Sequence, residues 1–224
     1  MILLGALVNA LAVVAGGLAG TFGGKLLPER IRTALITTMG LITIGIAVPG
    51  LIETSNLLIP ILSMVIGTFL GELIDIDGAL QKLSNALQSK FKGSSVAEGF
   101  FTCSLVFAVG AVAVMGALDS GLKGDHNLLY AKALMDGTAA IAFAAALGLG
   151  VVFSSVTVFV VEGGIALLAG LVADLLSTSV INEISFVGSL LIVGISLNMM
   201  GATKLRILNM VPALVLPILF CQFM

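Results

Sequence analysis

The stretch GALDSGLKGDHNLLYAKALMDGTAA, residues 116–140, gathers charge in a chain that otherwise carries little of it. It holds the only histidine of the sequence and five charged residues: His126, Asp119, Lys123, Asp125, Lys132 and Asp136. Lys132 and Asp136 are four residues apart, so on a helix they share one face and can pair. An ionised carboxylate in hydrocarbon is costly unless it is paired or hydrated. The pattern indicates a solute, cation or proton site, or else a structural ion pair that fixes this helix against a neighbour.

Four further polar residues are candidates for the same site. Thr138 follows Asp136 closely enough to donate a hydrogen bond to it. Glu162 lies about 12 Å inside the membrane if its helix begins near residue 154, at a rise of ~1.5 Å per residue, and at the interface if the helix begins near 160. The amides of Asn198 and Asn209 stand within or beside apolar helices, where they bond a neighbouring helix or line a pathway.

Several enzyme chemistries lack the residues that they need. FGGKLL is not a phosphate-binding loop, because Leu26 stands where serine or threonine is required. A single histidine excludes a multi-histidine zinc or haem site, and Ser154 and Ser155 have no nucleophile signature around them. We therefore expect no enzyme activity, no catalytic residue, no cofactor and no metal. Without a basic patch, we also expect no nucleic-acid partner.

The elements that position these residues are predicted to be membrane spans. The chain has 224 residues, of which 59% are hydrophobic and 10% are charged, whereas a soluble domain has about a quarter charged residues. A helix needs about 20 apolar residues to cross a bilayer. This predicts an all-α polytopic membrane bundle of seven or eight spans, near residues 2–24, 33–52, 57–76, 97–118, 131–150, 154–177 and 183–201. In the eighth piece, 206–223, Pro212 and Pro217 predict a kink, which leaves open whether it crosses or re-enters.

The chain divides into four parts at the sequence level: a three-span unit (1–76), an amphipathic cytoplasmic connector helix (77–95), a second three-span unit (96–178), and a C-terminal span with the short proline-containing helix (179–224). In the connector, leucines and Phe91 recur at helical spacing beside lysines. Three spans precede the connector and three follow it, so the second set would cross the membrane in the opposite direction. This suggests an inverted repeat, as in many secondary transporters. Shared lipid-facing composition is the alternative explanation for the similar segments.

The basic residues predict the orientation. With alternating spans, eight of the ten fall on one side, namely Lys25, Arg30, Arg32, Lys82, Lys90, Lys92, Lys204 and Arg206. The positive-inside rule then places the N-terminus outside. Glycines at Gly16, Gly20 and Gly24 and at Gly67 and Gly71 allow close helix packing, either within one chain or between copies in a homo-oligomer.

Several long motifs in order give the chain a family resemblance. They include NALAVVAGGLAG, LPERIR, GTFLGEL, the charged stretch 116–140, ISFVGSLLIVGISLN and NMVPALVLP, within residues 5–217. By these motifs the chain resembles the bacterial inner-membrane proteins typified by YqgA and YdfK, a domain-of-unknown-function family. The resemblance implies an inner-membrane protein with a role in transport and names no substrate. Glu162 differs from family members that carry glutamine in the sixth span.

These observations together predict a secondary transporter or channel-like carrier for a small solute or ion, with the lipid bilayer as its other partner. Asp136 and Lys132 would form the outer part of the site, with Thr138 beside them. Glu162, Asn198 and Asn209 are candidates for its deeper part. The alternative is a structural or regulatory membrane scaffold that binds a partner and transports nothing.

Overall fold

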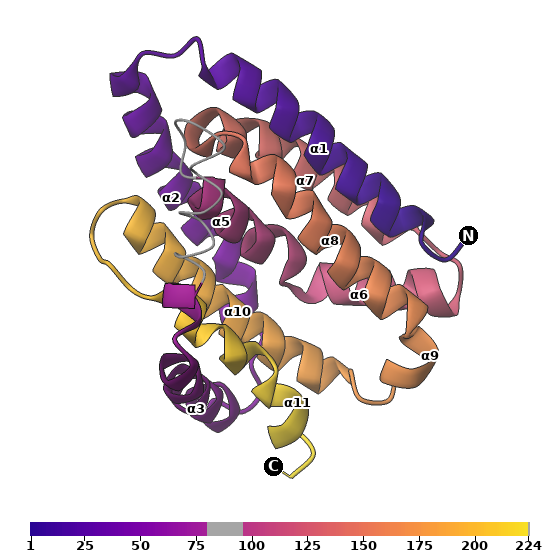
Figure 1. The fold of residues 1–224 in the computed structure, drawn as a ribbon. Helices are drawn as coiled ribbons and strands as arrows, with labels where there is room; N and C mark the ends of the chain where they lie inside the picture. The colour runs from indigo at the N-terminus through magenta and orange to yellow at the C-terminus, as the bar shows by residue number, and fades with distance from the viewer. Residues whose placement is uncertain (80–95, 224) are drawn as a thin grey trace.

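The computed structural model describes residues 1–79 and 96–223, and this part of the chain is helical without strands. The predicted all-α membrane bundle is confirmed in architecture, while residues 80–95 of the predicted connector lie outside the described residues. The elements are α1 (Leu4–Gly24), α2 (Glu29–Leu51), α3 (Leu58–Ile74), α5 (Val96–Ala108), α6 (Ala111–Leu122), α7 (Asn127–Leu147), α8 (Gly150–Leu167), α9 (Ala169–Val172), α10 (Thr178–Met199), the 3-10 helix η1 (Ile207–Leu214) and α11 (Leu216–Phe220) (Figure 1).

Not every predicted span is one straight helix. Among the described residues, α1, α2, α7, α8 and α10 are each long and apolar enough to cross a membrane. The predicted span 97–118 is instead a pair of helices, α5 and α6, bent by 62°. α3 and the segment Ile207–Phe220 are shorter apolar helices. The described residues therefore hold five candidate spans, or six if the bent pair counts as one.

Local sequence explains where several helices begin and end. Pro28 precedes α2 with a φ of −57°, and Glu29 places an acid in the first turn, as proline geometry and the helix dipole favour. Ser177 caps α10 by accepting a hydrogen bond from the Val180 N–H at 3.4 Å. α7 ends at Leu147, and the Gly148 that follows has a φ of 79°, which is accessible to glycine. α8 then begins at Gly150, four residues before the expected start of the sixth span.

The glycine pattern of α1 packs against α7. A Cβ added at Gly16 would meet the Gly137 carbonyl oxygen at 2.1 Å, and one at Gly20 would meet the Ile141 oxygen at 2.1 Å. A step of four residues along α1 thus corresponds to a step of four residues along α7. The two helices therefore run parallel, and their backbones are in close contact (Figure 1). Gly67 and Gly71 allow an equally close approach of α3 to η1, because a Cβ at these positions would meet the backbone of Ala213 and of Asn209. Both glycine patterns therefore serve packing within one chain.

The two ends of the bundle follow from these contacts. Ser120 Oγ, near the end of α6, donates to the Ile2 carbonyl at 3.0 Å, so the start of α1 and the end of α6 lie together. We call this the Met1 end, formed by residues 1–3, 52–57, 123–126 and 168–177. The opposite end, where Gly24 of α1 meets Ala145 of α7, we call the Lys25 end, and it includes residues 25–28, 148–149 and 200–206.

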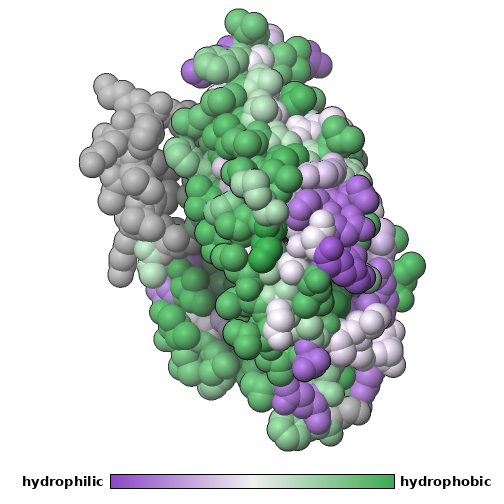
Figure 2. All heavy atoms as spheres, turned by 90° about the vertical axis from the view of Figure 1, so that its right-hand side faces the viewer, coloured by the Kyte–Doolittle hydropathy of each residue, from purple (hydrophilic) through white to green (hydrophobic). Residues whose placement is uncertain are grey.

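The outer surface of the bundle is largely apolar. α3 exposes Leu58, Val65, Phe69 and Leu73, each by more than half of its surface. Figure 2 shows hydrophilic side chains gathered over part of one face and bordered by extensive hydrophobic surface. Water does not stabilise such a surface, but the acyl chains of a bilayer do.

The close approach of α1 to α7 makes a specific prediction for Gly20. Gly20→Ala places a methyl group against the Ile141 carbonyl and Ala144, and overpacking of this kind costs about 1–3 kcal/mol. We expect a lower thermal midpoint for the purified protein in detergent. Gly23→Ala is the matched control, because nothing lies within 4 Å of that added Cβ. Equal midpoints for the two variants would contradict the described packing.

Candidate functional site

The helix that the sequence predicts as a fourth span is interrupted inside the bundle. α5 ends at Ala108 and α6 begins at Ala111. Between them Gly110 has a φ of 143°, which a residue with a Cβ rarely adopts. Gly188 of α10 makes room for the interruption, since a Cβ there would meet Val109 Cγ1 at 2.1 Å. Such a break frees carbonyl groups at the end of α5, and these need donors from elsewhere.

Lys132 of α7 supplies a donor at the break. Its Nζ donates to the carbonyl oxygen of Phe107, in the last turn of α5, and to Oδ2 of Asp136. The predicted pairing of Lys132 with Asp136 is therefore present, and both residues are only 8% exposed. Because a helix C-terminus carries a partial negative charge, the end of α5 and the carboxylate stabilise the same ammonium.

Two side chains from other helices complete this arrangement. Asn9 of α1 donates through Nδ2 to Asp136 Oδ2 at 3.0 Å and to Glu162 Oε1 at 2.8 Å. Glu162 Oε1 also lies 3.7 Å from Lys132 Nζ. Asn9 and Glu162 are fully buried. We call Asn9, Lys132, Asp136, Glu162 and the Phe107 carbonyl the break cluster.

The position of Glu162 settles a question that the sequence left open. α8 runs from Gly150 to Leu167, so Glu162 lies about 18 Å from its start and about 8 Å from its end at ~1.5 Å per residue. The alternative in which this helix begins near residue 160 is wrong, because α8 begins at Gly150, and Glu162 is fully buried within the bundle. Asn9 is equally close to the start of α1. The break cluster therefore lies in the half of the bundle nearer the Met1 end.

The break cluster has surplus negative charge and polar atoms without partners. When all three groups are ionised, the single positive charge of Lys132 faces the two carboxylates of Asp136 and Glu162, which leaves a net charge of −1. Among the residues that the structure describes, Glu162 Oε2 and Asn9 Oδ1 are buried and have no hydrogen-bond partner. Buried polar atoms are nearly always paired in native proteins. Chemically, this arrangement can accept one more proton or a small cation.

Thr138 does not join the break cluster. Its hydroxyl donates to the Leu134 and Met135 carbonyls of its own helix, at 2.8 and 2.9 Å, and the residue is exposed. Two positions beyond Asp136 on a continuous helix, Thr138 points to a different face. The expected hydrogen bond to Asp136 is absent from the structure.

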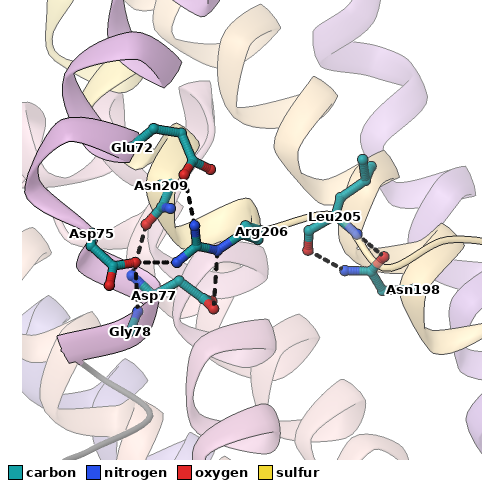
Figure 3. A network of polar contacts seen from close by, with 8 residues as sticks. All are labelled: Glu72, Asp75, Asp77, Gly78, Asn198, Leu205, Arg206 and Asn209. Atoms are coloured by element: carbon teal, nitrogen blue, oxygen red, sulfur yellow. Dashed lines mark hydrogen bonds and ion pairs between the residues drawn. The ribbon is translucent and has the colours of Figure 1, made fainter.

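Asn198 and Asn209 lie near the Lys25 end, in structural roles (Figure 3). Asn198 holds the turn after α10, where its Oδ1 accepts from the Leu205 N–H at 2.9 Å and its Nδ2 donates to the Leu205 carbonyl at 2.8 Å. Asn209 of η1 accepts from the Asp77 N–H at 2.7 Å. The structure therefore does not bring either amide to the break cluster.

Arg206 links the same region to the end of α3. Its guanidinium pairs with Asp75, lies 2.7 Å from Glu72 Oε2 and 3.7 Å from Asp77 Oδ2 (Figure 3). The hydrogen bond to Asp75, reinforced by the neighbouring negative charges, raises the pKa of Arg206 above its usual value. Arg206 therefore ties η1 to α3 at this end of the protein.

The other charged residues of the stretch 116–140 lie in the last turn of α6 and in the turn at the Met1 end. Lys123 pairs with Asp119 at 2.6 Å, and this lysine is largely exposed. His126 Nδ1 lies 2.6 Å from Ser120 Oγ, and Asp125 accepts from the Asn127 N–H at 3.0 Å. These contacts shape the loop that leads into α7.

Glu183, a second fully buried glutamate, was not among the residues expected from the sequence. It accepts from Thr54 Oγ1 at 2.7 Å, from the Ser55 N–H at 3.1 Å and Oγ at 3.3 Å, and from the Asn56 N–H at 3.2 Å. Both carboxylate oxygens therefore have donors from the α2–α3 turn. The polar run TSN in that turn was a usable signal, although nothing in the sequence pairs it with Glu183.

Two members of the break cluster, Asn9 and the Phe107 carbonyl, were not among the predicted site residues. Asn9 is one of several asparagines in apolar segments, but it lies seven residues before Gly16 and so shares the face that the glycine pattern turns to α7. The Phe107 carbonyl has no sequence signature, because any residue carries one.

Comparison with known proteins agrees with this architecture. The family model described as "Protein of unknown function (DUF554)" matches residues 4–222. The chain belongs to this family. One similar relative is the "Uncharacterized membrane protein YdfK" of Bacillus subtilis, 29% identical over 217 residues, which cover 95% of this chain and 93% of the relative. Another is the "Uncharacterized protein YqgA" of Escherichia coli, 29% identical over 220 residues, with coverage of 95% and 94%.

No solved structure matches the chain. The family assignment confirms the resemblance seen in the sequence motifs. With the apolar helices of the fold and a relative described as a membrane protein, it supports the conclusion that the chain is an integral membrane protein.

The burial of Lys132 predicts a large cost for its removal. Lys132→Met leaves Asp136 and Glu162 without a cation, and breaking a buried pair costs about 3–5 kcal/mol. We expect a strongly reduced unfolding midpoint in detergent, partly restored in Lys132→Met/Asp136→Leu. Lys123→Met is the matched control, since it breaks an exposed pair of the same spacing and should change the midpoint little. Similar midpoints for Lys132→Met and Lys123→Met would contradict the buried cluster.

Proposed function

We propose that this protein is a secondary transporter or channel-like carrier of a small solute or ion, and that the break cluster is its binding site. The observation that carries the proposal is a buried cluster of one lysine and two carboxyl groups at the interruption of a helix inside a membrane bundle. Secondary transporters commonly build their sites at such breaks, where helix ends and freed carbonyls contact the substrate or the coupling ion.

Intramembrane charge supports the same proposal. Charged residues inside membrane segments are expensive and usually serve transport or proton transfer. Glu162 of α8 contacts both Asn9 of α1 and Lys132 of α7. Three helices and a broken fourth therefore contribute to one site. An inverted repeat of spans and a homo-oligomer remain predictions.

The alternative is a scaffold that binds a partner and transports nothing. The low exposure of Lys132 and Asp136 favours it, since a sealed ion pair can simply lock α7 against α5. Ligand binding at the cluster distinguishes the two functions.

The first test is a thermal-stability screen of the purified protein against ions and metabolites. A ligand at 100 times its dissociation constant stabilises the protein by about 2.7 kcal/mol. We expect one ligand to stabilise the wild type and Thr138→Val, whose side chain faces away from the cluster. Asp136→Asn should lose this stabilisation, and uptake of the same ligand into proteoliposomes should fall to background. A ligand response that persists in Asp136→Asn would place the site elsewhere, and the absence of any response would favour the scaffold.

We also propose that the chain lies in the bacterial cytoplasmic membrane with its N-terminus outside. Lys25, Arg30, Lys204 and Arg206 lie at the Lys25 end, whereas Lys123 lies in the loop at the Met1 end. This asymmetry favours a cytoplasmic Lys25 end. The break cluster is then nearer the outer face.

Cysteine labelling in whole cells tests this orientation. In a chain without Cys103 and Cys221, Lys123→Cys should react with a membrane-impermeant maleimide, and Lys25→Cys should react only after the cells are opened. The reverse pattern would show that the N-terminus is inside.

A further inference from the structure

The hydrogen-bond donors and acceptors of the break cluster are not fully paired with one another. Glu162 accepts one hydrogen bond within the described part of the chain, from Asn9 Nδ2 to Oε1. In that same part of the chain, Glu162 Oε2 is buried without a donor, and Asn9 Oδ1 is buried without a partner. Both unpartnered atoms thus belong to the two side chains that already share the Nδ2–H···Oε1 hydrogen bond.

One proton accounts for all of these features. A proton on Oε2 cancels the surplus charge of the cluster and turns this oxygen into a donor. The acceptor that lacks a donor is the amide oxygen of Asn9. A carboxylic acid and a primary amide form a closed pair in this way, each donating one hydrogen bond to the other.

We propose that Glu162 carries a proton on Oε2, shares it with Asn9 Oδ1, and that the break cluster binds and releases this proton as its coupling ion. The coupling role rests on the proposed transport function, whereas the protonated state of Glu162 does not. The inference deepens that function by naming the ion as a proton.

Glu183 is a fully buried glutamate in the same protein with a different set of hydrogen-bond partners. Four donors from the α2–α3 turn reach its two oxygens. Charge-assisted hydrogen bonds of this kind replace the hydration of a carboxylate. Among the described residues Glu162 has only the one donor from Asn9, so its second oxygen lacks the hydrogen bonds that a buried carboxylate needs and that Glu183 has.

Release of the proton acts on the broken helix through Lys132. The proton leaves Oε2 to water, and the new carboxylate attracts the ammonium, whose Nζ lies 3.7 Å from Oε1. A movement of Lys132 toward Glu162 weakens its hydrogen bond to the Phe107 carbonyl. The end of α5 then loses its donor, which links proton release to the geometry of the α5–α6 break.

The groups that face Glu162 are few among the described residues. α7 contributes the charges of Lys132 and Asp136, and α1 contributes the neutral amide of Asn9. On α5, Cys103 is a buried thiol that interacts with Asp136. On α6, Asp119 is paired with Lys123 at the Met1 end. The balance at Glu162 is therefore set by one cation and one other carboxylate.

Infrared difference spectroscopy of the purified protein, with carbon-13-labelled glutamate, tests this directly. A protonated carboxyl group absorbs at a carbonyl frequency that a carboxylate lacks. We expect one such glutamate band at neutral pH, lost reversibly at high pH and absent from Glu162→Gln. Glutamine keeps the shape and donor of the acid, so this variant should remain folded. Glu183→Gln is the matched control and should keep the band.

A second variant keeps the test independent of the folding of Glu162→Gln. Asn9→Leu removes the proposed acceptor and should shift the band toward the frequency of a carboxyl without a hydrogen bond. The absence of a band, or a band that survives Glu162→Gln, would overturn the proposal. Stabilisation by Li⁺, Na⁺ or K⁺ at fixed pH that Glu162→Gln abolishes, without an acid band, would also overturn it and assign the site to a metal cation.

The experiments distinguish a protein that does not transport from one in which Glu162 carries no proton. The infrared band needs no substrate, so it can be present in a protein that moves no solute. If uptake is found, coupling predicts that a pH gradient drives it in the wild type and has no effect in Glu162→Gln. Uptake driven equally in both would overturn the coupling role.

Discussion

The cost of a charge in hydrocarbon is the constraint on which the rest of this structure depends. Lys132 is almost fully buried, and its ammonium is stable there only because a carboxylate and the carbonyl end of α5 surround it. The interruption of the α5–α6 helix and the buried lysine are therefore one feature. The break needs a donor for its free carbonyl, and the lysine needs acceptors that a continuous helix would not offer.

Close packing of α1 on α7 brings the remaining members of the break cluster within reach. The backbones approach closely because Gly16 and Gly20 carry no Cβ. Asn9 lies on the same face of α1 and bridges Asp136 to Glu162 of α8. A larger residue on this face would move Asn9 away from both carboxylates, so the glycines, which touch no charged group, still control the geometry of the site.

The protein contains two kinds of polar network. At Glu183 both buried carboxylate oxygens have donors, and around Arg206 the ion pairs to Glu72 and Asp75 are largely exposed; each network fixes one connection of the chain, the α2–α3 turn to α10 and η1 to α3. The break cluster differs, because it holds one carboxyl group more than its single cation pairs with, and among the described residues two of its buried oxygens have no partner. Fully satisfied networks hold a structure in place, whereas an incompletely satisfied one can change its protonation or its ligand. This difference is the physical basis for assigning function to the break cluster.

The sequence by itself determined the class of the protein, since apolar composition and helix-length hydrophobic runs allow only a membrane bundle. It also determined that Lys132 can pair with Asp136, because helix periodicity fixes neighbours four residues apart. It did not select Asn9 over Asn198 and Asn209, since all three are amides in similar surroundings. It also did not reveal the broken span, because the run through Gly110 is apolar throughout. Those choices belong to the tertiary structure: residues from α1, α7 and α8 meet only once the helices pack, and which carbonyl is free depends on where packing lets a helix break.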